Sequence, residues 1–142
     1  MSEVRWWPTP KPGLLAAVHI LGLAFSNVVP VSTRLPARNM PDQFIKVTRI
    51  GGRQTDLATD MMRLLVECYG LSQFQCEMMC NQARAAFRNS VGTTQSVSHN
   101  GMAFEVFIRG YGAESGPTDR PHPDVLNRDR WEFQAELAVK AN

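Results

Sequence analysis

The stretch Trp131-Glu-Phe-Gln-Ala-Glu-Leu-Ala-Val139 decides the fold class of this chain. Apolar and polar side chains alternate along it, and a period of two is typical of a strand that buries one face. The stretch therefore predicts an amphipathic strand whose buried face is formed by Trp131, Phe133, Ala135, Leu137 and Val139.

Two earlier stretches alternate in the same way. Residues 44–50 place Ile45 and Val47 on one side and end at Gly51-Gly52, which predicts a strand followed by a turn. Residues 61–69 predict a second strand, whose apolar face is formed by Met62, Leu64, Val66 and Cys68.

A β-hairpin is predicted around Asn100-Gly101. This dipeptide favours a tight two-residue turn, and it is flanked by weak strand character at 93–98 and by alternation at 104–109. Residues 110–128 carry many glycines and prolines, so we expect a long irregular loop before the final strand.

Two helices are predicted. Residues 72–89 begin with a capping box, Ser72-Gln-Phe-Gln75, and end with cations that the helix dipole favours. Residues 13–26 carry an apolar stripe at helical spacing, formed by Leu14, Val18, Leu21 and Phe25. A secretory signal peptide is the alternative for 13–26, although His19 interrupts the run, which is also too short to span a bilayer.

The element order predicts an α+β fold with a mixed or antiparallel sheet of about four to five strands. Both helices are expected on one face. The other face would be polar with a few large side chains, Tyr69 and Phe107, and would be free to meet solvent or a neighbour. We expect residues 1–12 to form an extended or disordered leader and residues 13–142 a single domain.

The 142 residues have a formal net charge of only +2, which argues against a strongly basic nucleic-acid binder. The charge is unevenly spread, because residues 1–55 carry +5 and residues 56–142 carry −3. Such an asymmetry favours a charge-complementary interface between protein subunits. A small nucleic-acid-binding protein remains the alternative, because the basic residues between 34 and 53 include Arg34, Arg38, Arg49 and Arg53.

No part of the sequence predicts catalysis. The serines lack a nucleophile elbow and the histidines lack a surrounding motif, so we expect no enzyme activity and no cofactor. The odd cysteine count argues against a disulfide framework, and the spacing does not fit a zinc site. We expect all three thiols to act as small buried apolar side chains, at Cys68, Cys76 and Cys80.

A combination of local patterns resembles one family. An apolar N-terminal helix is followed by a strand that runs into Val47-Thr-Arg-Ile-Gly-Gly52, and Asp60 leads into the strand 61–69. A helix then starts at Ser72, and Pro123-Asp124 precedes Arg130-Trp131. Over residues 12–140 these features resemble the tail terminator, or tail-completion, proteins of long-tailed siphophages. In that family the last strand typically begins with Arg-Tyr, where this chain has Arg-Trp.

The resemblance implies a structural virion protein that forms a ring, most simply a hexamer. Such a ring caps the finished tail tube, stops its polymerisation and joins the tail to the head-tail connector, while DNA passes through the lumen without sequence-specific binding. Its location would be the virion neck, after assembly in the host cytoplasm, with no membrane involved. A head-tail stopper, a head-completion protein and a tail-tube subunit are the alternatives within the virion.

The expected contact segments are the predicted loops 51–60 and 110–128. Loops carry function more often than scaffold elements do. We expect Asp60, Asp124 and Arg130 to fix the shape of these loops or to pair across them. Together with the basic cluster, the predicted subunit or partner interface comprises Arg34, Arg38, Arg49, Arg53, Asp60, Asp124 and Arg130.

Overall fold

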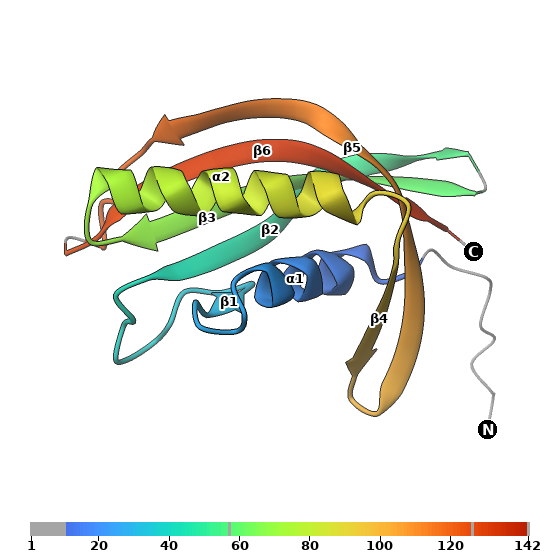
Figure 1. Cartoon of the computed structure of the whole chain (residues 1–142), viewed down its shortest axis with the longest axis horizontal. Coiled ribbons are helices and arrows are strands. Elements are labelled where there is room, and N and C mark those ends of the chain that lie inside the picture. Colours follow the sequence, from blue (N-terminus) through green and yellow to red (C-terminus); the bar gives the residue numbers. More distant parts are fainter. Residues whose placement is uncertain (1–10, 57, 126, 142) are drawn as a thin grey trace, which may run out of the picture.

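The computed structural model describes residues 11–56, 58–125 and 127–141 (Figure 1). Nearly all of the predicted leader, with Trp6 and Trp7, therefore lies outside the described residues. The elements in chain order are α1 (Gly13–Ala24), β1 (Val31–Ser32), β2 (Phe44–Asp56), β3 (Thr59–Gly70), α2 (Gln73–Ser90), β4 (Thr94–His99), β5 (Met102–Asp119) and β6 (Asp129–Lys140).

The six strands form one sheet in the order β1-β2-β3-β6-β5-β4. Only the β1–β2 pair is parallel, and every other neighbouring pair is antiparallel. The α+β class and the mixed sheet are thus confirmed, with one strand more than predicted. The added strand, β1, is two residues long and lies in the proline-rich segment 28–41, outside the stretches that predict strands.

Strand β5 is long and strongly bent, and it curls the sheet around the helices (Figure 1). Its first part pairs with β4 over residues 102–107, and its second part pairs with β6 over residues 108–119. The prediction of a loop across 110–128 is therefore wrong for residues 110–119. Three register shifts in the β5–β6 ladder accommodate the glycines and the proline that suggested a loop.

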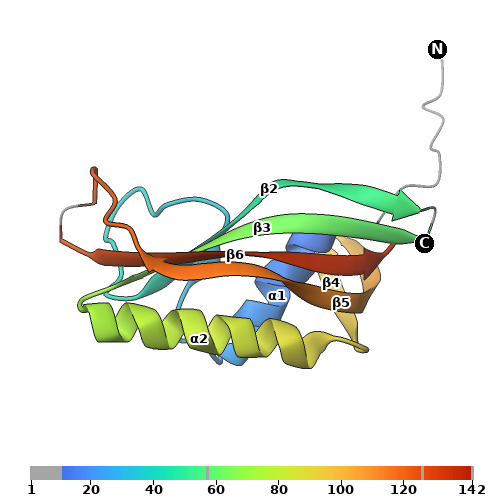
Figure 2. The same ribbon diagram turned by 90° about the horizontal axis from the view of Figure 1, so that it is seen from above.

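Both helices pack on the same face of the sheet, as predicted (Figure 2). The inward residues of β3 and β6 alternate with the expected period, and Met62, Leu64 and Leu137 are fully buried. From the helical side, α2 contributes Cys76, Met79, Cys80, Ala83 and Phe87 to the same cluster. All three cysteines are buried, as expected.

The buried face of α1 differs from the predicted stripe. Its buried residues are Gly13, Ala16, Ala17, Ile20 and Leu21, whereas the larger Leu14, Val18 and Phe25 pack only partly buried at its flanks. Close packing explains the difference, because a Cβ atom added at Gly13 would lie 2.4 Å from the sulfur of Met62. Small side chains therefore face the core where the helix approaches the sheet.

The start of α2 is set by the predicted cap. The Ser72 hydroxyl accepts a hydrogen bond from the Gln75 backbone N–H at 3.2 Å. In return, the Gln75 side chain accepts one from the backbone N–H of Leu71 at 2.8 Å, one residue before the usual position. Two otherwise free backbone donors are satisfied, and the helix begins one residue after its cap.

A second apolar cluster covers one end of the opposite sheet face. The Phe44 and Tyr69 rings stack with centroids 4.4 Å apart, and Val125, Leu35 and Met40 pack around them. The expectation that Tyr69 faces solvent or a neighbour is therefore wrong, since this residue is fully buried. The segments 35–40 and 120–125 fold over it, because large rings left exposed together would cost hydrophobic free energy.

The β2–β3 hairpin continues past the predicted turn at Gly51-Gly52. Strand β2 runs on to Asp56 and pairs with β3 down to Thr59, with a bulge between Arg49 and Gly51. Gly52 has a φ of +113°, and a Cβ atom there would lie 2.0 Å from the carbonyl oxygen of Met61. The glycines permit a bulged strand rather than ending it. We call residues 49–56 and 59–63 the β2–β3 arm, and β2 is exposed along all of it.

Candidate interaction surfaces

Two of the predicted interface residues meet on the β2–β3 arm, Arg49 from its base and Asp60 from near its far end. The Arg49 guanidinium donates to both carboxylate oxygens of Asp60, at 3.1 and 3.0 Å. Asp60 is only 4% exposed, so its charge is shielded from water and depends on this partner. A planar, two-pronged contact also fixes the guanidinium orientation. The pair therefore holds the twist of the arm where the bulge interrupts the ladder.

Arg130, a third predicted residue, lies on the opposite sheet face beside the second apolar cluster. Its guanidinium donates to Glu67 at 2.9 Å and to the backbone carbonyl of Arg120 at 2.5 Å. Glu67 is 4% exposed and also accepts a hydrogen bond from the Tyr69 hydroxyl at 2.9 Å. Burial and the adjacent Glu67 carboxylate raise the pKa of Tyr69. This network ties the segment after β5 to the start of β6.

Further along the same face, charges of opposite sign pair between strands. Lys46 lies 4.0 Å from Glu67, and Arg120 lies 3.2 Å from Glu132. Arg63 spans three strands, because it donates to Ala113 of β5 at 3.0 Å and lies 3.8 Å from Glu136 of β6. From the sequence we expect this face to be polar and free to meet solvent or a neighbour. The pairs occupy most of the charges there, which leaves the face polar but nearly neutral.

A charge cluster that was not predicted from the sequence lies between α2 and β5. Glu114 accepts hydrogen bonds from Arg84 and from Arg88, the latter at 2.6 Å. Burial alone would raise the pKa of Glu114, but the two arginines outweigh it, so the pKa lies below its ordinary value. The spacing of the two arginines, four residues apart on a helix, was the available signal, because it puts both on one helix face.

The four remaining predicted residues are exposed and stand apart from these networks. Arg34 and Arg38 lie in the segment between β1 and β2, and Arg53 lies on the arm. Asp124 lies in the segment before β6, where its backbone N–H donates to the His122 ring at 3.0 Å. Within the described ranges, none of these four side chains forms a salt bridge. The structure thus joins Arg49 to Asp60 but does not bring all seven residues to one surface.

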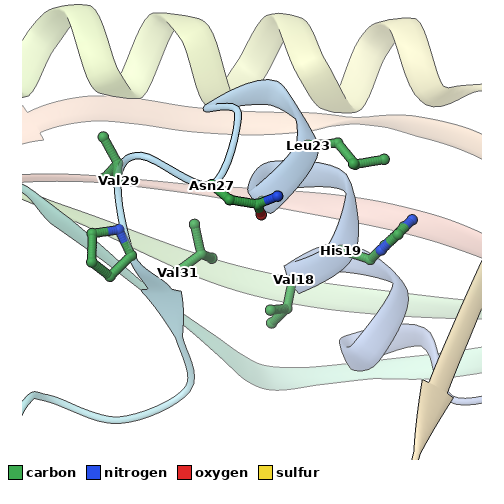
Figure 3. A pocket seen from close by; sticks show the side chains of 8 residues that line it. Val18, His19, Leu23, Asn27, Val29 and Val31 are labelled. Atoms are coloured by element: carbon green, nitrogen blue, oxygen red, sulfur yellow. The ribbon is translucent and has the colours of Figure 1, made fainter.

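A cavity of about 300 Å³ lies between α1 and the segment that follows it (Figure 3). Figure 3 shows Asn27 between the helix and this segment, with valines 18, 29 and 31 around it. His19 is the only titratable group in the lining. A small cavity with one such group does not form a catalytic arrangement.

The described residues contain no cluster of three or more histidine, cysteine or acidic side chains that could hold a metal ion. The thiols are poorly suited to nucleophilic chemistry, since burial raises the pKa of Cys76 to about 11 and also raises that of Cys68. Neither described helix is both long and apolar enough to cross a membrane.

No protein-family model matches the sequence, and no curated protein matches it significantly.

Proposed function

We propose that this protein is a tail terminator of a long-tailed bacteriophage. In this role it is a structural virion protein of the neck, and six copies form a ring that caps the finished tail tube. The ring ends tube polymerisation and joins the tail to the head-tail connector, with DNA passing through its lumen. The proposal rests on the resemblance in the sequence and on one structural observation.

That observation is that the residues carrying the resemblance also shape the β2–β3 arm. Arg49 and Asp60 pair along the arm, and Gly52 allows the close approach of the two strands. An element built for packing alone would bury its side chains, yet residues 49–56 are exposed. An ordered but exposed arm is suited to contact with a neighbouring subunit or with the tail tube.

Two open strand edges support assembly with other chains. The β1 strand covers the outer edge of β2 only at Ile45 and Lys46, and β4 covers β5 only over 102–107. Among the residues that the structure describes, the rest of each outer edge has no strand partner. Unpaired backbone groups on a sheet edge offer hydrogen bonds to another chain.

Electron microscopy of the purified protein mixed with tail tubes tests the proposal. We expect one ring at one end of each tube and no growth beyond it. Loss of the Arg49–Asp60 pair by Arg49→Ala should reduce the fraction of capped tubes, whereas Arg109→Ala, an exposed change on β5, should leave it unchanged.

Other results would identify the alternatives. Long cylinders formed by the protein alone would indicate a tail-tube subunit. Binding to the head connector without binding to tubes would indicate a stopper or head-completion protein. A gel shift that persists at ~200 mM salt would indicate nucleic-acid binding, because phosphate contacts weaken steeply with salt.

A further inference from the structure

An apolar ridge runs along the start of α2. It consists of Phe74 and Met78, which are four residues apart on one face of the helix, and of Leu71, which lies just before the helix, and we call it the α2 ridge. Phe74 is 80% exposed, Met78 70% and Leu71 54%. Single exposed apolar residues are ordinary, but a group of three large ones marks a contact surface.

An apolar groove lies between α1 and the tip of the β4–β5 hairpin, and we call it the α1 groove. It encloses about 590 Å³, and most of its lining is apolar, formed by Pro12, Leu14, Leu15, Val18, Met102 and Phe104. The remaining lining includes His99 and Asn100, and no acidic residue among those described borders it. Met102 is 61% exposed, so the groove is open to an incoming side chain.

The ridge and the groove lie too far apart to contact each other within one chain. Figure 1 places the start of α2 at one end of the molecule and the tip of the β4–β5 hairpin at the other. They can therefore meet only between two copies. Because the two surfaces differ, such a contact is head to tail rather than symmetric.

The polar groups beside the two surfaces are complementary. Glu77, exposed beside Met78, is the only charged residue between Leu71 and Ala83. The described groove lining has no acidic residue and includes the side chains of His99 and Asn100, which can donate hydrogen bonds. A carboxylate on the ridge would thus face hydrogen-bond donors on the next copy, which favours this register.

We propose that Phe74 and Met78 of one copy insert into the α1 groove of the next copy. This inference rests on the proposed function, because it supplies the contact between neighbouring ring subunits. A head-to-tail contact repeated around an axis closes into a ring when the rotation between copies is right. Apolar insertion would provide most of the favourable free energy, and the flanking polar groups would set the orientation.

Two variants with acidic substitutions at exposed positions test the contact. Phe74→Asp with Met78→Asp removes the ridge, and His99→Asp with Met102→Asp blocks the groove. In sedimentation velocity at about 100 μM protein, we expect oligomers of the wild type and single chains of each variant. Val91→Asp, at an exposed apolar residue outside both surfaces, is the control and should assemble like the wild type.

Mixing the two variants is the decisive measurement. The ridge variant keeps an intact groove, and the groove variant keeps an intact ridge. An equimolar mixture should therefore form heterodimers and no larger oligomers. Failure to form heterodimers, with both variants folded by circular dichroism, overturns the inference. The inference is also overturned if either variant alone forms oligomers of the same size as the wild type does. In each of these two outcomes, the ring proposal stands if rings still cap tail tubes.

Two further outcomes also overturn the inference. Wild-type protein that remains monomeric and does not cap tubes overturns it together with the proposed function. Retained oligomers with a shifted tryptophan emission in the groove variant would instead assign the groove to the leader that contains Trp6 and Trp7.

Discussion

Three carboxylates with little access to water, together with their arginine partners, hold separate elements of this molecule together. Asp60 fixes the arm, Glu67 links β3 to β6, and Glu114 links β5 to α2. A buried carboxylate without a partner costs several kcal/mol, so each arginine matters more than an exposed ion pair would. The sequence shows which residues carry charge, but it does not show which of them meet, because the partners lie 11, 63 and 26 positions apart.

The Glu114 contact predicts a dependence of stability on pH. Its pKa is lowered below the ordinary value of 4.5, so the folded state holds this proton less readily than the unfolded state does. The stabilisation is therefore complete well above pH 4.5 and is lost as the pH falls through the folded value. Glu114→Gln should lower the free energy of unfolding at pH 7 by about 1 kcal/mol, and this difference should shrink towards pH 3.

Urea denaturation at several pH values measures this effect. Asp119→Asn is the matched control, because Asp119 is exposed on the same strand, and its effect should be small at every pH. A difference for Glu114→Gln that stays constant from pH 7 to pH 3 would contradict the assignment.

Gly52 is the residue on which the shape of the arm depends most. An alanine there would combine a φ of +113° with a Cβ atom 2.0 Å from a backbone oxygen. Gly52→Ala should destabilise the protein by about 2–4 kcal/mol, measured as a lower urea midpoint. Gly51→Ala is the comparison, because its φ of +152° also strains an alanine but nothing lies within 4 Å of its added Cβ atom, so the difference between the two variants reports the contact with Met61. Equal midpoints for the two variants would show that the strands can separate without cost.

At the scale of elements, prediction succeeded where the signals were local. The capping box placed the start of α2 correctly, and the period of two in β6 identified its buried face. It failed for the second half of β5, where Gly110, Gly112 and Pro117 suggested a loop. That half is a strand because β6 offers a ladder partner, and a tertiary partner overrides local propensity.

The same reasoning explains the arm and the second apolar cluster. Gly51-Gly52 has the composition of a turn, but β3 continues beside it and extends the pairing. Likewise, the period of two in β3 does not reveal that segments from two distant parts of the chain cover Tyr69. These contacts depend on long-range packing, which a local pattern does not encode.

The α2 cap predicts the effect of a single substitution. Ser72→Ala removes the acceptor for the Gln75 N–H and should lower the free energy of unfolding by about 1 kcal/mol. Thermal unfolding followed by circular dichroism measures the change. Ser98→Ala, at an exposed strand position, should leave the midpoint nearly unchanged. If both variants melt alike, the cap does not contribute to stability.

At the scale of the whole molecule, the uneven charge of the sequence is distributed over distinct surfaces. The basic excess of residues 1–55 includes Arg34, Arg38 and Arg53, which are exposed, whereas many acidic residues of the second part are already paired within the chain. The free positive charges are therefore those available to a neighbour.

Charge reversal at Arg34 and Arg38 tests this distribution. Under the proposed function, the double change to glutamate should weaken incorporation into virions at least tenfold, because like charges would then oppose the proposed partner surface, while the melting midpoint stays within a few degrees. Reversal of Arg109 and Lys140, which are also exposed, changes the net charge equally and should not affect incorporation. Normal assembly of the Arg34/Arg38 variant would show that these exposed arginines are only solvated and that the uneven charge does not serve an interface.

The position of β6 between β3 and β5 also affects the order in which the strands can pair during folding. The hairpins β2–β3 and β4–β5 are synthesised first, and β6, which joins them, follows both. Gly70 and Asp129 pair although 59 positions separate them. The pairing of β3 with β6 is therefore a non-local step, and such steps are slow in folding. Until then the nascent chain exposes two inner strand edges that are paired in the finished fold. Folding thus ends with the insertion of a central strand, and the incomplete chain is most prone to aggregation just before that event.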